Sequence, residues 1–182
     1  MIDVDLVVFD IDGTLVHPKG RRVIRKAREK GDKEGMKAAY TKHAHAPVLR
    51  VLDEVPSSVD VLVVTSRSSS REEETLAFLN DHFFPRVGAH TRRIFVSFRG
   101  DKNKPCPKEK VRRLLALTAV CRSIRGKVSM VKSVLIYEDD EEVIAELLRA
   151  RRKHRHMPKR FVVKQPQYDK EGKSLPLITH EI

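Results

Sequence analysis

The chain lacks tryptophan, has few other aromatic residues and contains only two cysteines. With so few aromatic residues there is no evident platform for stacking bases, so any nucleic-acid binding would depend mostly on phosphate contacts. Cys106 and Cys121 do not have the close spacing of a metal site, and they do not make a disulfide framework. We interpret both as reduced thiols of a cytosolic-type protein.

Long apolar runs are also absent. No stretch approaches the roughly 20 apolar residues that a membrane helix needs, and Met1 leads into the first expected strand without a signal or transit peptide. We therefore expect a cytoplasmic or nuclear protein that is not secreted. A length of 182 residues favours one domain with a sizeable core, placed at residues 1–165, followed by a C-terminal tail at 166–182.

Acidic residues are too few to balance the basic ones. The formal net charge is +12 and the pI is about 9.9, which favours an anionic partner, with nucleic acid the obvious polyanion. The alternative is that the charge only keeps the protein soluble. Two segments concentrate this charge. The first contains Lys19, Arg21, Arg22, Arg25, Lys26, Arg28, Lys30, Lys33, Lys37, Lys42 and Arg50, and the second contains Arg149, Arg151, Arg152, Lys153, Arg155, Lys159 and Arg160.

Short apolar segments alternate with helical segments along the chain, which is typical of an α/β fold with a parallel sheet. Strands are expected at residues 6–9, 59–64, 94–96, 134–137 and 161–163. Helices are expected after Pro47, after Ser70, over residues 108–121 and after Asp140. Ser70 and Glu73 have the spacing of a capping box. The basic segment at 17–45 is interpreted as a small helical insertion after the first strand.

Two carboxylates follow the first strand directly. Asp10 and Asp12 have the i, i+2 spacing that places two side chains on the same side of a strand, and Gly13 then turns the chain. Neighbouring carboxylates repel unless a positive group lies between them, and a divalent metal is the usual solution. Polar residues also follow the second and fourth expected strands. Because ligands bind at the carboxyl ends of parallel strands, these groups are expected to share one site.

The Asp-x-Asp-Gly-Thr sequence after an apolar strand resembles motif I of the haloacid dehalogenase (HAD) superfamily of Mg-dependent phosphohydrolases. Three later segments resemble the other motifs in order: Thr65-Ser66-Arg67, Lys104-Pro105-Cys106-Pro107 and Glu138-Asp139-Asp140. The resemblance spans residues 5–150 and implies a Rossmann-like three-layer sandwich with a central parallel sheet of about five strands and a small basic cap.

The resemblance also implies a role for each motif. Asp10 would be the nucleophile that forms an aspartyl phosphate, and Asp12 would be the general acid and base, which favours a phosphatase over a dehalogenase. Thr65 and Ser66 would bind the phosphoryl group. Lys104 would balance its charge, with Lys102, Lys108 and Lys110 as competitors. Mg²⁺ would be held by Asp10, Asp139 and the backbone carbonyl of Asp12, with Asp140 or Glu138 assisting.

The substrate is less constrained by the sequence. The acidic turn and the Thr-Ser-Arg strand end are loosely similar to polynucleotide 3′-phosphatase and other RNA-repair HAD domains, and the basic insertion suits a polyanion. Our leading hypothesis is removal of a terminal phosphate from RNA or DNA. A phosphatase for a small nucleotide or sugar phosphate is the main alternative, and a non-catalytic nucleic-acid-binding protein is a third. Candidate substrate-binding residues are Arg67, Arg71, Arg21, Arg22 and Arg25.

Overall fold

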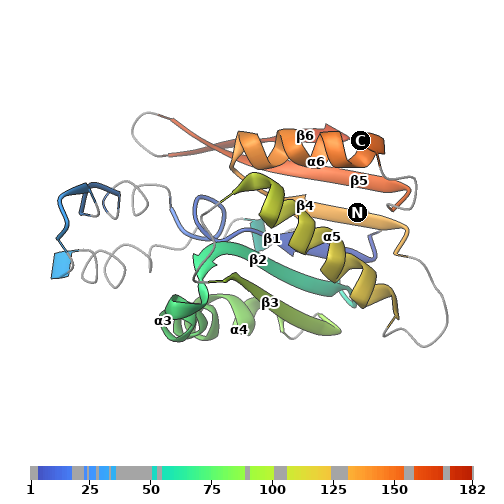
Figure 1. The fold of residues 1–182 in the computed structure, drawn as a ribbon. Helices are drawn as coiled ribbons and strands as arrows, with labels where there is room; N and C mark the ends of the chain where they lie inside the picture. Colours follow the sequence, from blue (N-terminus) through green and yellow to red (C-terminus); the bar gives the residue numbers. More distant parts are fainter. Residues whose placement is uncertain are drawn as a thin grey trace.

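The structure of the chain is a computed structural model (Figure 1). The structure describes residues 4–17, 23, 25–27, 29–32, 34–35, 51–52, 55–88, 91–100, 106–123, 131–153, 158–169 and 173–181. Among these residues no helix is long and apolar enough to cross a membrane.

A single sheet of six strands organises the described residues, in the order β3-β2-β1-β4-β5-β6. The strands are β1 (Leu6–Phe9), β2 (Asp60–Ser68), β3 (Arg93–Arg99), β4 (Ser133–Tyr137), β5 (Arg160–Tyr168) and β6 (Ser174–Glu181). The first five are parallel, and β6 pairs antiparallel with β5 at one edge. The predicted α/β fold with a mainly parallel sheet is therefore confirmed.

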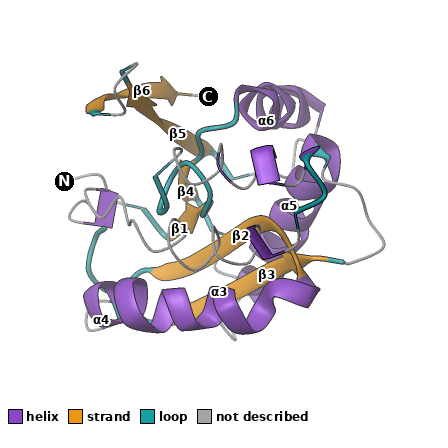
Figure 2. Ribbon diagram, turned by 90° about the vertical axis from the view of Figure 1, so that its left-hand side faces the viewer, coloured by secondary structure: helices purple, strands orange, loops and turns teal. Residues whose placement is uncertain are grey.

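Helices cover both faces of this sheet (Figure 2). One face packs against α3 (Glu72–Phe78), a π-helical turn at Leu79–Phe83 and α4 (Phe84–Val87). The other packs against α5 (Pro107–Ser123) and α6 (Glu141–Lys153). Because strand side chains alternate, Val7 and Phe9 lie in the first core and Leu6 and Val8 in the second. This burial on both faces explains why the strand sequences are continuous apolar runs.

The sixth strand was not predicted. β5 continues beyond Val163 to Tyr168, and β6 lies within the expected tail at 166–182. Leu175 and Ile178 of β6 are 41% and 46% exposed, so this edge strand lacks the buried apolar run on which the strand predictions depended. The C-terminal segment consequently belongs to the sheet.

The expected capping box at Ser70 is wrong. Residues Ser69–Arg71 form a 3₁₀ turn, and α3 begins at Glu72 with Arg71 as its N-cap and without a side-chain capping hydrogen bond. Ser70 hydroxyl instead lies 2.7 Å from the hydroxyl of Ser68. Three glutamates in the first turn of α3 still favour the positive end of its dipole.

The described residues of the basic insertion lie to one side of the sheet (Figure 1, blue, left). Helical residues occur on both sides of Gly31, and most of their side chains are exposed. Arg25 is 3.7 Å from Glu29 in an exposed ion pair. Arg21 and Arg22, as well as Pro47, lie outside the described residues.

Candidate active site

The candidate site lies where the strand order reverses. From β1 the chain builds β2 and β3 on one side, and it then crosses over to build β4 and β5 on the other side of β1, so the strand order reverses between β1 and β4. In open α/β sheets this switch point is where ligands bind. Asp10 follows β1, Thr65 lies near the end of β2 and Glu138 follows β4. The structure therefore brings together the three strand ends that the sequence marked.

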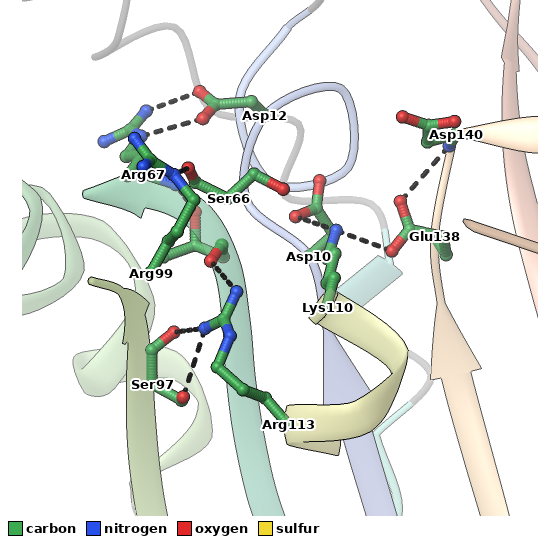
Figure 3. Close-up of polar contacts among 11 residues, drawn as sticks. Asp10, Asp12, Ser66, Arg67, Ser97, Arg99, Lys110, Arg113, Glu138 and Asp140 are labelled. Atoms are coloured by element: carbon green, nitrogen blue, oxygen red, sulfur yellow. Dashed lines mark hydrogen bonds and ion pairs between the residues drawn. The ribbon is translucent and has the colours of Figure 1, made fainter. Parts of the chain in front are cut away.

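Asp10 is buried against a lysine from α5. The ammonium Nζ of Lys110 lies 2.6 Å from Asp10 Oδ1 and 2.7 Å from Glu138 Oε2 (Figure 3). The three side chains are only 6%, 4% and 3% exposed for Asp10, Lys110 and Glu138. Asp10 continues the strand face of Leu6 and Val8, which α5 covers, and this explains why its cation comes from α5.

The charges of this buried group depend on one another. Burial raises the pKa of Glu138 to about 7, while the charge of Lys110 lowers it and that of Asp10 raises it. Burial by itself lowers the pKa of Lys110, but the charges of Asp10 and Glu138 outweigh it and raise the pKa above its ordinary value. One protonated ammonium thus faces two buried carboxyl groups.

Asp12 points to a different partner. Its carboxylate accepts two hydrogen bonds from the Arg67 guanidinium, at 2.9 Å from Nε and 2.7 Å from Nη2 (Figure 3). Arg67 also donates to the hydroxyl of Thr75 on α3, and its side chain is 3% exposed. A bidentate pair of this kind fixes the orientation of the Asp12 carboxylate as well as balancing its charge. Arg67, expected as a substrate-binding residue, is buried and holds Asp12.

The Thr65 hydroxyl accepts a hydrogen bond from the backbone N–H of Arg67 at 3.1 Å. Its own hydrogen therefore remains a donor for another group. The carbonyls of Thr65 and Ser66 accept bonds from Arg113 and Arg99, which tie the end of β2 to α5 and β3. Arg71 pairs with Glu74 of α3 at 3.0 Å on the surface. The two hydroxyls expected to bind phosphate thus lie on a braced strand end.

The acidic turn after β4 packs closely against the turn after β1. Gly13 has a φ of +106°, and a Cβ built on it would lie 2.0 Å from Asp139 Oδ2. Only glycine satisfies both the backbone conformation and this close approach. Asp140 instead caps the start of α6, because its Oδ1 accepts a hydrogen bond from the backbone N–H of Glu142. Asp139 is therefore the carboxylate of this turn that lies against motif I.

A cation fits this arrangement. One carboxylate oxygen from each of Asp10, Glu138 and Asp139 can be chosen so that all three lie within 4.8 Å of one another. Oxygen ligands of this kind suit Mg²⁺. Asp10, Asp139 and Glu138 carry up to three negative charges against the single charge of Lys110, so an additional cation would reduce their repulsion. The donor set and its charge agree with a divalent metal.

The sequence predicted Lys104 as the charge-balancing lysine. Lys104 lies outside the described residues. The lysine that the structure places on Asp10 is Lys110, one of the named competitors. The sequence did contain a pattern that favoured Lys110. Lys110, Leu114 and Thr118 are four residues apart on α5, so the lysine lies on the buried face of the helix. A lysine on such a face needs an acidic partner.

The end of β5 beyond the predicted segment also reaches the site, which the sequence did not indicate. Tyr168 donates its hydroxyl to the Gly13 carbonyl at 2.9 Å, and its ring packs edge-on against His17. Burial, with a contribution from Asp139, raises the pKa of Tyr168 above its ordinary value, so the hydroxyl stays protonated. The Gln165 amide donates to the Asp139 carbonyl at 3.3 Å. β5 therefore holds both the motif I turn and the acidic turn.

Comparison with solved structures finds similarity to a HAD-superfamily hydrolase of subfamily IA, variant 1, from Geobacter sulfurreducens PCA. The two chains are 15% identical, the similarity covers 79% of this chain and 83% of that chain, and the TM-score is 0.38. No protein-family model matches the sequence, and no curated protein matches it.

Proposed function

We propose that this chain is a Mg-dependent phosphohydrolase that works through an aspartyl phosphate on Asp10. The observation that carries the proposal is the Asp10–Lys110 contact of 2.6 Å at the end of the central strand, with Glu138 and Asp139 beside it. A buried carboxylate with a lysine against it and other acids nearby is costly to maintain as structure alone. It suits a reaction that brings a phosphate into the site.

Asp10 and Asp139 are the proposed protein ligands of Mg²⁺, with the backbone carbonyl of Asp12, and with Glu138 or Asp140 assisting. When bound, the metal would supply positive charge that offsets the charges of the nucleophile and the phosphoryl oxygens. Glu138 is already engaged by Lys110, and Asp140 caps α6. These contacts make Asp139 the stronger candidate of the acidic turn.

The proposed reaction has two steps. An Asp10 carboxylate oxygen attacks phosphorus, the ester P–O bond breaks, and Asp12 gives a proton to the departing oxygen. A water then attacks the phosphorus of the aspartyl phosphate and gives its proton to Asp12. Inorganic phosphate leaves and the Asp10 carboxylate is restored. Lys110 keeps the Asp10 carboxylate oriented for attack. Arg67 keeps the Asp12 side chain in the same orientation in both steps.

Phosphate binding is assigned to Thr65, Ser66 and the lysine of the site. Thr65 supports this role because its oxygen is occupied by the Arg67 N–H and its hydrogen is left to donate. Lys110 takes the charge-balancing position in place of Lys104, which stays an untested candidate outside the described residues. Hydrogen bonds of this type strengthen as charge develops on the phosphoryl oxygens.

The leading substrate is a nucleic-acid end that carries a phosphate. The basic insertion at 17–45 supports this choice, because most of its described residues are exposed and lie to one side of the sheet (Figure 1, left). Arg21, Arg22 and Arg25 are its candidate phosphate contacts. Arg67 and Arg71 are already paired with Asp12 and Glu74, so they contribute less to substrate binding than the sequence suggested. A small phosphate ester remains the alternative substrate.

The test is Mg²⁺-dependent phosphate release from a 3′-phosphorylated oligonucleotide, its 5′-phosphorylated counterpart and a sugar phosphate. Asp10→Asn is the blank, because the amide keeps the shape of the side chain and removes the nucleophile. Preferential release from an oligonucleotide supports the proposal in full. Release from the sugar phosphate alone keeps the phosphohydrolase and rejects the nucleic-acid substrate. Activity that survives in Asp10→Asn would overturn the assigned nucleophile.

A further inference from the structure

A second concentration of positive charge lies at the end of the sheet where β4 and β5 begin, opposite the candidate site at the carboxyl ends of the strands. α6 begins beside the acidic turn and runs along the sheet to the end where β4 and β5 start (Figure 1). Its 13 residues correspond to a length of about 20 Å. The last turn of α6 contains Arg151, Arg152 and Lys153. These side chains are therefore separated from Asp10 by the length of the helix.

Residues from two other segments join them. The Arg160 backbone N–H donates to the Lys132 carbonyl at 3.0 Å, which places the starts of β5 and β4 together. Arg151 donates from Nη2 to the Lys159 carbonyl at 3.3 Å, which connects the end of α6 to the same place. We call this set the distal basic edge. It consists of Lys132, Arg151, Arg152, Lys153, Lys159 and Arg160.

Most of this positive charge is exposed. Lys132, Arg152, Lys153, Lys159 and Arg160 are all exposed. The nearby acids are mostly used elsewhere. Asp5 accepts the backbone N–H groups of Lys132 and Ser133 at 2.7 and 3.1 Å, and buried Asp60 pairs with Arg93 at 2.9 Å. Glu181 lies 3.8 Å from Arg160, both side chains being at least half exposed. Screening by water makes such an exposed pair weak.

Helix capping does not explain the whole set. Basic residues in the last turn of a helix are favoured by the helix dipole, and this accounts in part for Arg151, Arg152 and Lys153. Lys132 and Lys159 lie outside the helix, so a preference for basic residues in its last turn does not account for them. The described residues of the chain give no ion pair for Arg152, Lys153, Lys159 or Lys132. Their charges are available to an external anion.

We propose that the distal basic edge binds the phosphate backbone of double-stranded nucleic acid, independently of the reaction at Asp10. A duplex presents about one negative charge per 1.7 Å and so matches a surface on which exposed cations outnumber the acids. The six residues that define the edge are all lysine or arginine, so they offer no aromatic ring on which unpaired bases could stack. The large apolar side chains exposed among the described residues are Val23, Leu175 and Ile178, so the edge offers none for insertion into a membrane.

The distal basic edge is not an extension of the candidate site. Glu141, Glu142 and Glu146 lie on the first half of α6, between the acidic turn and the basic end. A nucleic-acid backbone following α6 toward Asp10 would meet these like charges. The edge is therefore a separate docking surface, and its occupancy does not require a terminal phosphate or a metal.

The test is binding of a fluorescent duplex of about 20 base pairs with hydroxyl ends and no Mg²⁺, at several salt concentrations. Wild type is compared with Arg152→Gln/Lys153→Gln. The control Lys108→Gln/Lys173→Gln removes the same charge from exposed positions at the other end of the molecule. We expect the first pair to weaken binding roughly tenfold or more near 0.1 M salt and to reduce the salt slope by about 1.8. The control should change affinity by about twofold or less.

A second pair, Lys132→Gln/Lys159→Gln, tests the same edge without altering α6. Both edge variants, Arg152→Gln/Lys153→Gln and Lys132→Gln/Lys159→Gln, should unfold at the wild-type temperature. Both should also retain wild-type phosphate release from a small substrate. Equal losses in the edge variants and the control would overturn the proposal, because net charge would then explain the binding. No duplex binding by wild type, or binding only to vesicles containing anionic lipid, would overturn it as well.

Discussion

The Lys110 ammonium lies 2.6 Å from the Asp10 carboxylate, and both side chains are almost completely buried. The same ammonium lies 2.7 Å from Glu138. A charge removed from water in this way is tolerated only while its partners remain. Lys110 therefore links α5 to the carboxyl ends of β1 and β4, and the candidate nucleophile depends on it for stability as well as for charge.

Replacing Lys110 by methionine leaves Asp10 and Glu138 buried without their common cation. We expect Lys110→Met to reduce the free energy of unfolding by about 3–5 kcal/mol. The exposed Lys108→Met, two residues earlier on α5, should change it by no more than about 0.5 kcal/mol. Urea unfolding without metal measures both. Adding Glu138→Gln to Lys110→Met should recover part of the loss, because it removes one of the facing carboxylates.

A loss in Lys110→Met no larger than that in Lys108→Met would contradict the buried cluster. A large loss that Glu138→Gln deepens would also contradict it, since relief of repulsion predicts the opposite sign. Mg²⁺ added to Lys110→Met gives a further check, because a divalent cation near Asp10 should restore some of the lost stability.

Arg67 and Asp12 should behave as one unit. Their bidentate pair is mostly buried, so the single changes Arg67→Gln and Asp12→Asn should each be destabilising, and the double change should cost less than their sum by about 1–3 kcal/mol. Arg67→Lys should not restore the wild-type value, because an ammonium lacks the planar fork. A double-mutant cycle from urea unfolding measures the coupling.

The surface pair Arg71–Glu74 is the matched control for that cycle. It has a similar contact of 3.0 Å, but its side chains are 29% and 46% exposed. Its coupling should be about 0.2–1 kcal/mol. Equal coupling in the two pairs would mean that Arg67 does not hold Asp12 more firmly than an ordinary surface contact would.

Much of the fold could be predicted because the strands are buried on both faces. Leu6–Phe9, the start of β2 and the start of β5 are continuous apolar segments, and such segments are recognisable without any knowledge of their neighbours. β6 was missed because it lies at an edge, where Leu175 and Ile178 are exposed and no buried face imposes a pattern. Tyr168 and Gln165 were missed for another reason, because β5 continues past the predicted segment at 161–163 with polar residues.

The candidate site could be located from the sequence because strand ends gather at one edge of a parallel sheet. The partners within it could not be chosen in the same way. Lys104 and Lys110 are six residues apart in the sequence, and the motif resemblance favoured Lys104, whereas α5 packs on the sheet with Lys110 against Asp10. Arg67 was equally ambiguous, because a strand end alone does not indicate whether a guanidinium faces solvent or Asp12.

Gly13 should be irreplaceable for two separate reasons. Gly13→Ala forces a side chain into a φ of +106° and brings its Cβ within 2.0 Å of the Asp139 carboxylate. Gly31→Ala is the control, because Gly31 has a φ of +66° but nothing within 4 Å of the added Cβ. We expect Gly31→Ala to cost about 1 kcal/mol from backbone conformation alone. Gly13→Ala should cost clearly more and should also weaken Mg²⁺ binding, measured by calorimetry.

Equal costs for the two alanine substitutions would show that the turn after β1 can move away from Asp139. In that case the close contact between the two turns would not be required for folding. Unchanged Mg²⁺ binding in a folded Gly13→Ala protein would argue against Asp139 as a ligand, since the displaced carboxylate would no longer lie beside motif I.

The two aspartates of the acidic turn should respond differently to metal. Mg²⁺ at 100 times its dissociation constant should stabilise the wild-type protein by about 2.7 kcal/mol, seen as a rise in unfolding temperature that EDTA reverses. Asp139→Asn should abolish this rise, because its carboxylate lies beside Asp10 in the acidic cluster. Asp140→Asn should keep it, because Asp140 caps α6 and asparagine is nearly as good an N-cap. The reverse pattern would move the metal ligand from Asp139 to Asp140, and a rise retained in both variants would place the metal away from this turn.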